Sequence, residues 1–280
     1  MREEPATDEL DTQDALELLA RGDLEVAGRI VDASNATLLA TVSADGVSAT
    51  CVYKPVSGER PLWDFPGRTL ARREVAAYLV SAAAGFDVVP PTVLREDAPF
   101  GAGSVQLWVT ADDGPAEPGA GMVDVLRPRE VGRDWLRVLD AYGADGEPVV
   151  LVHRDDPRLA TMAVFDAVVN NADRKGGHVL RDGDALRGVD HGLTFHAEPK
   201  LRTVLWGWAG APLPAGDRDR LAVLDAALGA TALPAGLADL AVLLAAEELA
   251  SLRDRTRQLL RRRRFPLPEE DRPLIPWPPF

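Results

Sequence analysis

The most informative stretch of the chain is Asn170-Asn171-Ala172-Asp173-Arg174-Lys175-Gly176-Gly177-His178, which is followed twelve residues later by Asp190-His191-Gly192. Residues 159 to 169 upstream have an apolar, helix-like pattern, and two short apolar runs downstream flank the turn Asp182-Gly183. Asp173 is therefore expected in a loop after a helix, and Asp190 at the end of a strand. Two carboxylates and an imidazole near one point are what a divalent metal ion carrying a polyphosphate requires.

The composition is that of a soluble globular protein. The 280 residues are 46% hydrophobic and 27% charged, which is enough for one large core or two lobes. The net charge of -13 argues against a nucleic-acid-binding protein, because such a protein needs a basic face to neutralise phosphates. No apolar run is long enough to span a membrane and the acidic start is unlike a signal peptide, so we expect a cytoplasmic protein without a transmembrane segment.

The single cysteine, Cys51, lies in an apolar strand pattern. It excludes a disulfide within the chain, and it is expected to be a buried structural thiol in a reducing compartment.

The N-terminal part predicts an antiparallel sheet. After a flexible terminus at residues 1–10 and a helix from Asp11 to Arg21, strands are expected within 24–31, 37–42 and 47–54. Strands at 88–94 and 104–109 would complete a sheet of about five strands, with one main helix at 69–84. The loop at 32–36, between the first two strands, is either a close approach to a phosphate or an ordinary hairpin loop.

Two charged residues of this part are expected to form an ion pair. Lys54 ends the third strand on the same face as Val52, and an inward-facing lysine requires an anion. Glu74 shares a mostly small, apolar helix face with Ala77, where its carboxylate needs a partner. The alternative is a solvated glutamate beside Arg73.

The Pro/Gly/Asp-rich stretch 112–121 is the predicted boundary between one part at 11–111 and a second at 112–264. Beyond it the periodicity predicts helices at about 133–141, 156–169, 217–228 and 237–263. The proline-rich tail at 265–280 is expected to be extended and to pack on the body through Trp277 and Phe280.

The order of these parts resembles a protein-kinase-like fold: a strand lysine, a helix glutamate, a linking strand, a loop aspartate, and a later aspartate after a hairpin. The chain resembles the atypical kinases related to type II phosphatidylinositol 4-kinases and HipA-type kinases, and more closely a bacterial phosphatidylinositol 3/4-kinase-like family. The specific motifs are Asp173-Arg174 with His178 five residues after the aspartate, and Asp190 followed by Gly192. The resemblance implies an α+β, bilobal fold with an antiparallel-sheet N-lobe and a mainly helical C-lobe.

The resemblance also implies ATP and Mg²⁺ or Mn²⁺ as ligands, and a role for each matching residue. Asp173 would act on the attacking hydroxyl, with Lys175 near the transferring phosphate, while His178 and Asp190 would hold the metal ion. The nucleotide would be bound by Lys54, Glu74, the covering-loop residues Ser34, Asn35 and Thr37, and backbone groups around Gln106, Leu107 and Trp108.

The chain departs from the family pattern at three places. It has no glycine-rich loop, His178 stands where many relatives have asparagine, and Asp190-His191-Gly192 replaces aspartate-phenylalanine-glycine. Because an imidazole nitrogen also suits manganese, the metal preference stays open.

Two other classes of function are compatible with the sequence. A catalytically silent nucleotide-binding module would use the same fold as a scaffold. A metal-dependent phosphohydrolase is suggested by the clustering of all four histidines between His153 and His196, although the order Asp190-His191 after a hairpin fits that class less well. For a kinase the acceptor hydroxyl belongs to a protein, a small molecule or a lipid, and the acidic chain gives little support for the lipid.

Overall fold

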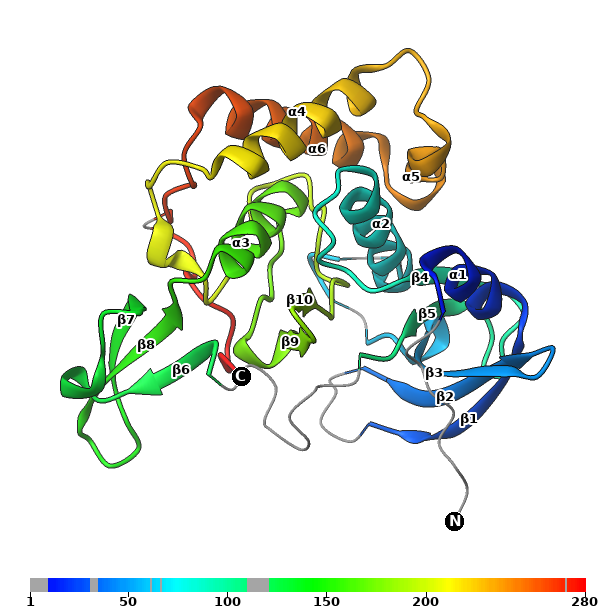
Figure 1. Cartoon of the computed structure of the whole chain (residues 1–280), viewed down its shortest axis with the longest axis horizontal. Helices are drawn as coiled ribbons and strands as arrows, with labels where there is room; N and C mark the ends of the chain where they lie inside the picture. Colours follow the sequence, from blue (N-terminus) through cyan, green and yellow to red (C-terminus); the bar gives the residue numbers. More distant parts are fainter. Residues whose placement is uncertain (1–9, 31–34, 61, 66, 110–120, 270) are drawn as a thin grey trace.

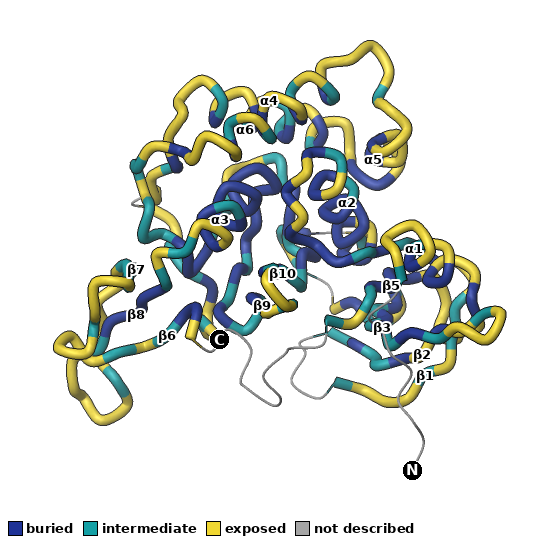
Figure 2. The backbone as a smooth tube through the Cα atoms, in the orientation of Figure 1, coloured by how far each residue is buried: buried dark blue, intermediate teal, exposed yellow. Residues whose placement is uncertain are grey.

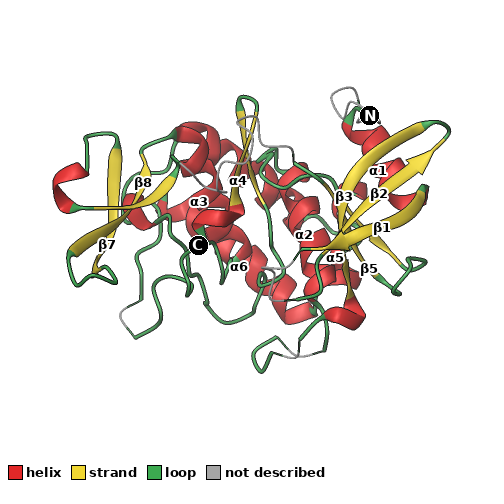
Figure 3. Cartoon of the chain, turned by 90° about the horizontal axis from the view of Figure 1, so that it is seen from below, coloured by secondary structure: helices red, strands yellow, loops and turns green. Residues whose placement is uncertain are grey.

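A computed structural model describes residues 10–30, 35–60, 62–65, 67–109, 121–269 and 271–280. Within these ranges the protein is an α+β structure with six α-helices and three antiparallel sheets. The two larger sheets lie at opposite ends of the long axis, with helices between them (Figure 1 and Figure 3). None of the described helices is long and apolar enough to cross a membrane.

The N-terminal sheet has the order β1-β2-β3-β5-β4 and contains the five predicted strands. Its members are β1 (Asp23–Arg29), β2 (Leu38–Ala44), β3 (Val47–Pro55), β4 (Thr92–Arg95) and β5 (Gly103–Leu107). Asp45 and Gly46 have positive φ values, as the tight turn between β2 and β3 requires. Helix α1 (Thr12–Arg21) begins where predicted, because the Asp11 carboxylate accepts hydrogen bonds from the amides of Gln13 and Asp14.

Helix α2 (Leu70–Ala83) connects this sheet with the rest of the molecule. It packs on β4 and β5 on one side and on α5 (Leu240–Leu243) on the other. Arg73 of α2 is buried, forms an ion pair with Glu248, and donates to the carbonyl of Thr194. Figure 2 shows α2 and α3 as the most continuously buried helices.

A second sheet, with the order β6-β8-β7, follows the predicted boundary region. Its strands are β6 (Val123–Leu126), β7 (Trp135–Tyr142) and β8 (Pro148–Arg154). The predicted helix at 133–141 is therefore wrong, and the second part is less helical than expected. A bulge between Arg137 and Leu139 interrupts the alternation of apolar and polar residues, which is the sequence signal of a strand.

The remaining elements are α3 (Pro157–Val169), the hairpin β9 (Val179–Asp182) and β10 (Ala185–Gly188), α4 (Ala215–Gly229), α5 and α6 (Ala246–Arg262). Helices α3 and α4 agree with the prediction. The single helix expected at 237–263 is wrong, since the backbone is extended at Leu244 and Ala245. The carboxylate of Glu248 accepts a hydrogen bond from the amide of Ala245, which stabilises the new helix start.

The buried apolar residues form one large cluster around α2, α3, α4 and α6, a smaller one beneath the N-terminal sheet, and a third of Phe65, Leu70 and Ala172. Cys51 belongs to the smaller cluster, and burial raises the pKa of its thiol to about 12, so the thiol is protonated as expected of a structural residue. In the tail, Trp277 is 85% exposed and does not pack as predicted, whereas Phe280 lies against Gly176. Most of the expected terminus at 1–10 and of the expected boundary stretch at 112–121, namely residues 1–9 and 112–120, lies outside the described residues.

Candidate functional site

Lys54, near the end of β3, meets acidic groups from two distant parts of the chain. Its Nζ lies 2.5 Å from Oε1 of Glu74 on α2, as predicted, and 2.9 Å from Oδ1 of Asp190, which follows β10. Burial alone would lower the pKa of Lys54, but Asp190 and Glu74 outweigh it and raise the pKa above its usual value. The ammonium group is therefore charged at neutral pH.

Glu74 also fixes the segment that carries Asp190. Its Oε2 accepts a hydrogen bond of 2.9 Å from the amide of His191. Burial raises the pKa of Glu74, while the Lys54 cation and this amide oppose the shift. A Cβ at Gly192 would lie 3.3 Å from Cβ of Leu70 and 3.6 Å from Oε1 of Glu74, so the segment passes close to α2.

Asp173, His178 and Asp190 form a second cluster beside this ion pair. One possible ligand atom from each residue lies within 4.8 Å of the other two. Nε2 of His178 is 3.4 Å from Oδ2 of Asp190, and Nζ of Lys175 is 3.7 Å from Oδ2 of Asp173. Asp190 has a positive φ of 59°, an uncommon conformation for a residue other than glycine.

The electrostatic environment gives this cluster a neutral imidazole and two carboxylates at neutral pH. Burial lowers the pKa of His178 to about 4, despite the nearby Asp190. The Lys54 cation holds the pKa of Asp190 well below its usual range against the effect of burial. Burial raises the pKa of Asp173 to about 6, with Lys175 opposing this shift. Carboxylate oxygens and a neutral imidazole nitrogen are ligand types for divalent metal ions.

A buried arginine network, which the sequence analysis missed, supports both loops of the site. Arg174 has no exposed surface, and it donates two hydrogen bonds of 2.9 Å to the carboxylate of Asp166 on α3. It also donates to the carbonyls of His178 and Val189 at 3.1 and 3.2 Å, and lies 2.7 Å from Nε2 of His191. Asp166, a charged residue inside the apolar helix pattern, was the sequence signal for this network.

The asparagines before Asp173 shape its loop. Asn170 ends α3 in the left-handed conformation, which asparagine tolerates better than most residues. Asn171 accepts a hydrogen bond of 3.0 Å from the amide of Asp173 through Oδ1 and donates at 2.9 Å to Asp166 through Nδ2. The loop position of Asp173 is thus tied to the same carboxylate that pairs with Arg174.

The structure brings together six of the predicted site residues: Lys54, Glu74, Asp173, Lys175, His178 and Asp190.

The other predicted nucleotide-binding residues have different contacts. Ser34 lies outside the described residues, and Oδ1 of Asn35 accepts a hydrogen bond from the amide of Arg60. Thr37 is buried, and its carbonyl accepts from the amide of Ile30.

The predicted adenine-binding residues belong to the end of the N-terminal sheet. The Gln106 side chain is buried and donates to the Thr92 hydroxyl at 2.8 Å. The amides of Leu107 and Trp108 donate to backbone carbonyls of Pro91 and Thr50, so these two N–H groups are already used within the protein.

Comparison with known proteins identifies a relative that matches nearly the whole chain. No protein-family model matches the chain. The chain is 50% identical over 268 residues to Protein Rv2133c of Mycobacterium tuberculosis, and the match covers 94% of each chain. An identity of this level over nearly the whole of both chains means that the chain belongs to the same protein family as Protein Rv2133c.

Proposed function

We propose that the protein is an ATP-dependent phosphotransferase of the phosphatidylinositol 3/4-kinase-like type, which transfers the γ-phosphate to a hydroxyl group. In this proposal the N-terminal sheet with α2 is an N-lobe, the rest is a C-lobe, and ATP binds between them. The sheet order and the sequence resemblance support this arrangement. Substrate, partner proteins and cytoplasmic localisation remain parts of the hypothesis.

The observation that carries the proposal is the convergence of Lys54, Glu74 and Asp190 on one point. Lys54 and Asp190 are 136 residues apart in the sequence, and they come from a strand and from a loop after a hairpin. Phosphoryl transfer depends mainly on positioning and on neutralising the charge of the phosphate oxygens. A lysine oriented by a glutamate and paired with Asp190, one of the proposed metal ligands, supplies groups for both tasks.

The cluster of Asp173, His178 and Asp190 fits a divalent metal ion. Its donor atoms lie within 4.8 Å of one another, and the imidazole is neutral at neutral pH because burial lowers its pKa to about 4. His178 and Asp190 would hold the ion, and Asp173 is close enough to contribute an oxygen. A bound Mg²⁺ or Mn²⁺ would neutralise charge on the β- and γ-phosphates.

The protein's own groups have distinct tasks in the proposed reaction. Lys54 binds the α- and β-phosphates, and Glu74 keeps its ammonium group in place. Asp173 orients the acceptor hydroxyl and accepts its proton, for which a pKa raised to about 6 is suitable near neutral pH. Lys175, 3.7 Å from Asp173, provides a positive charge near the transferring phosphate. Adenine would lie near Gln106, Leu107 and Trp108, with Asn35 and Thr37 on the phosphate-covering side.

The test combines binding and turnover. ATP with Mg²⁺ or Mn²⁺ should raise the melting temperature, and labelled ATP should give labelled product or phosphate. Asp173→Asn should reduce the turnover rate by about a hundredfold or more while leaving the ATP-dependent thermal shift in place, because the amide is a much weaker base.

Other outcomes identify the other classes of function. ATP binding without turnover, unchanged by Asp173→Asn, identifies a silent nucleotide-binding module. Metal-dependent hydrolysis of phosphate esters with no effect of ATP identifies a phosphohydrolase. Either result overturns the kinase proposal.

A further inference from the structure

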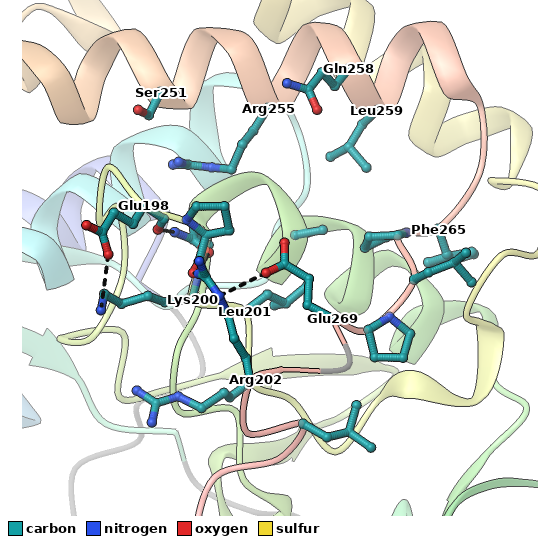
Figure 4. A pocket seen from close by; sticks show the side chains of 18 of the residues that line it. Glu198, Lys200, Leu201, Arg202, Ser251, Arg255, Gln258, Leu259, Phe265 and Glu269 are labelled. Atoms are coloured by element: carbon teal, nitrogen blue, oxygen red, sulfur yellow. Dashed lines mark hydrogen bonds and ion pairs between the residues drawn. The ribbon is translucent and has the colours of Figure 1, made fainter.

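A large cavity lies next to the candidate site but does not include its clustered side chains. It has a volume of about 1130 Å³ and lies between one face of α6, the loop at 197–202 and the tail at 265–274 (Figure 4). Asp173, Lys175, His178 and Asp190 are not among its lining residues. This volume is slightly larger than the roughly 300–1,000 Å³ of typical small-molecule pockets, so the cavity has room for such a ligand.

One wall of the cavity is hydrogen-bonded to the loop that carries Asp173. Arg202 lines the cavity, its amide donates to the carbonyl of Asn171, and its carbonyl accepts from the amide of Arg174. The positive charge of Arg202 is near enough to lower the pKa of Asp173. A ligand bound against Arg202 would therefore contact a segment that is hydrogen-bonded to the loop on either side of Asp173.

The cavity lining is cationic, although the whole chain has a net charge of -13. Six basic residues line it, against four acidic residues: Lys200, Arg202, Arg255, Arg262, Arg264 and Arg272, with Asp64, Glu198, Asp254 and Glu269.

Only some of these charges neutralise one another. Lys200 pairs with Asp64 and Glu198 at 3.4 and 3.8 Å, and Arg272 pairs with Glu269 at 2.9 Å. Within the described part of the chain, the other four arginines have no carboxylate within 4.0 Å. An anionic ligand would supply the missing counter-charge.

Arg255 is a largely buried cation of the cavity wall. It extends from α6 toward the loop that contains Glu198 and Lys200 (Figure 4). Its Nε donates to the carbonyl of Val168 at 3.0 Å and its Nη1 to that of His196 at 3.2 Å, but its buried Nη2 has no partner among the described residues. Burial lowers the pKa of Arg255 to about 10, which still leaves it charged at neutral pH.

The rest of the lining is suited to an apolar body. Leu259 points from α6 into the cavity in Figure 4, and Phe265 and Leu274 from the tail also line it. At the rim, Trp63 is 89% exposed and Leu267 is 70% exposed. An apolar ligand group could cover this surface and remove it from water.

We propose that this cavity binds an anionic amphiphilic small molecule, a compound with a phosphate or carboxylate group, a hydroxyl group and an apolar body, and that the hydroxyl of this compound is the phosphate acceptor. The acceptor role rests on the proposed phosphotransferase function, whereas the binding does not. In the transfer, the acceptor oxygen forms a bond to the γ-phosphorus and the bond between that phosphorus and the leaving oxygen of ADP breaks. The hydroxyl proton moves to the carboxylate of Asp173.

The binding test uses anilinonaphthalene sulfonate, a fluorescent probe with an anionic group on an aromatic body, and the full chain. The wild type should bind one equivalent, and Arg255→Met should weaken binding by about tenfold, because a charge-assisted hydrogen bond is lost. Arg262→Met should weaken it by about threefold, and this exposed residue has no described contacts whose loss would impair folding.

Arg257→Met is the matched control. Arg257 is on α6, two residues from Arg255, but it pairs with Asp225 and does not line the cavity. Equal probe affinity of the wild type, Arg255→Met and Arg262→Met would overturn the proposal, provided that circular dichroism shows the variants folded.

A competition experiment distinguishes a lipid ligand from a soluble anionic ligand. Octyl phosphate should displace the probe at concentrations where octanol does not, because octanol lacks the charge. If the protein sediments with vesicles containing phosphatidic acid, and Arg255→Met does not, the ligand is a lipid headgroup. If octyl phosphate displaces the probe but the protein does not sediment with the vesicles, the ligand is a soluble compound. Displacement by octanol and octyl phosphate at equal concentrations would contradict an anion site.

The acceptor role and the phosphotransferase function fail in different ways. If probe binding depends on Arg255 but the wild type transfers no phosphate from ATP, the phosphotransferase proposal fails and the cavity site stands. If the wild type labels products from ATP and Arg255→Met labels all of them at the same rate, the acceptor role fails.

Discussion

The two larger sheets of the protein each use one side chain of the central strand, and they use it in opposite ways. In the five-stranded sheet, β3 presents the charged Lys54 to carboxylates of Glu74 and Asp190. In the three-stranded sheet, β8 presents His153, which is fully buried, to the backbone around Gly207. One sheet thus supplies charge to the candidate site, while the other supplies a structural contact.

The contacts of His153 require the neutral imidazole. Its Nδ1 is 2.8 Å from the carbonyl of Arg154, so Nδ1 donates, and its Nε2 accepts from the amide of Gly207 at 2.9 Å. The ring also packs against Trp208, with ring centroids 4.3 Å apart. Burial lowers the pKa of His153 to about 4. The first sheet therefore needs a charged lysine at its central strand, whereas the second needs a neutral histidine there.

The largest expected effect is on activity, from a change in the five-stranded sheet. Lys54→Met should reduce the rate of phosphate transfer from ATP by about a hundredfold to a thousandfold, because the phosphate oxygens lose a preorganised cation. Turnover per folded molecule, measured with labelled ATP, checks this. Unreduced turnover would mean that Lys54 has only the structural type of role assigned to His153.

The next effect is a pH dependence of stability from the three-stranded sheet. Since the pKa of His153 is about 4 in the folded state and near 6.5 when unfolded, the unfolded state binds the proton more readily between these values. Its contribution to the free energy of unfolding is therefore present above pH 6.5 and lost as the pH falls toward 4, by up to about 3 kcal/mol. Urea denaturation of the wild type and His153→Asn across this range measures it. Equal pH slopes would contradict the prediction.

A smaller effect is expected where the three-stranded sheet meets the Trp206–Trp208 turn. A Cβ at Gly207 would lie 2.5 Å from Nε2 of His153 and 2.5 Å from Cβ of Leu136. Gly207→Ala should lower the free energy of unfolding by about 1 to 3 kcal/mol, because neighbouring groups must move. Thermal denaturation measures this loss, and ATP turnover per folded molecule should stay at the wild-type level. A parallel loss of turnover would show that this sheet also affects the site.

The smallest effect is expected at an exposed ion pair of the same sheet. Nη2 of Arg137 lies 2.6 Å from Oδ1 of Asp140, but the two side chains are 50% and 76% exposed. Arg137→Ala should change the free energy of unfolding by less than about 0.5 kcal/mol, because solvent screens the pair. Urea denaturation compares it with the wild type. A larger change would indicate that the bulge near Arg137 depends on this pair.

The first sheet could be predicted because its strands alternate and its turn has a recognisable sequence. Lys54 and Glu74 could also be paired from sequence, since each occupies an inward-facing position that needs an opposite charge. The second sheet could not be predicted, because the bulge before Leu139 shifts the pattern and leaves Leu139 partly exposed. The local pattern of apolar and polar residues does not reveal where a strand contains a bulge.

The acidic and basic residues of the candidate site could be predicted from the sequence, but the buried hydrogen-bond network that holds them in place could not. The spacing of Asp173 and His178 identifies possible metal ligands. The five hydrogen-bonding contacts of Arg174 join α3, the Asp173 loop and the residues on both sides of Asp190, and only the folded chain brings these together. The cavity likewise depends on where the tail returns, which a proline-rich sequence does not specify.

The pairing of Lys54 with Asp190 across 136 residues also constrains the order of events during synthesis. A nascent chain can complete the five-stranded sheet once β5 has emerged, but Lys54 then lacks Asp190. The hydrogen bond of the Gly176 amide forms later still, because its acceptor is the carbonyl of Pro279. Contacts of such sequence separation form slowly, so the candidate site is assembled only after the segment with Asp190 has left the ribosome.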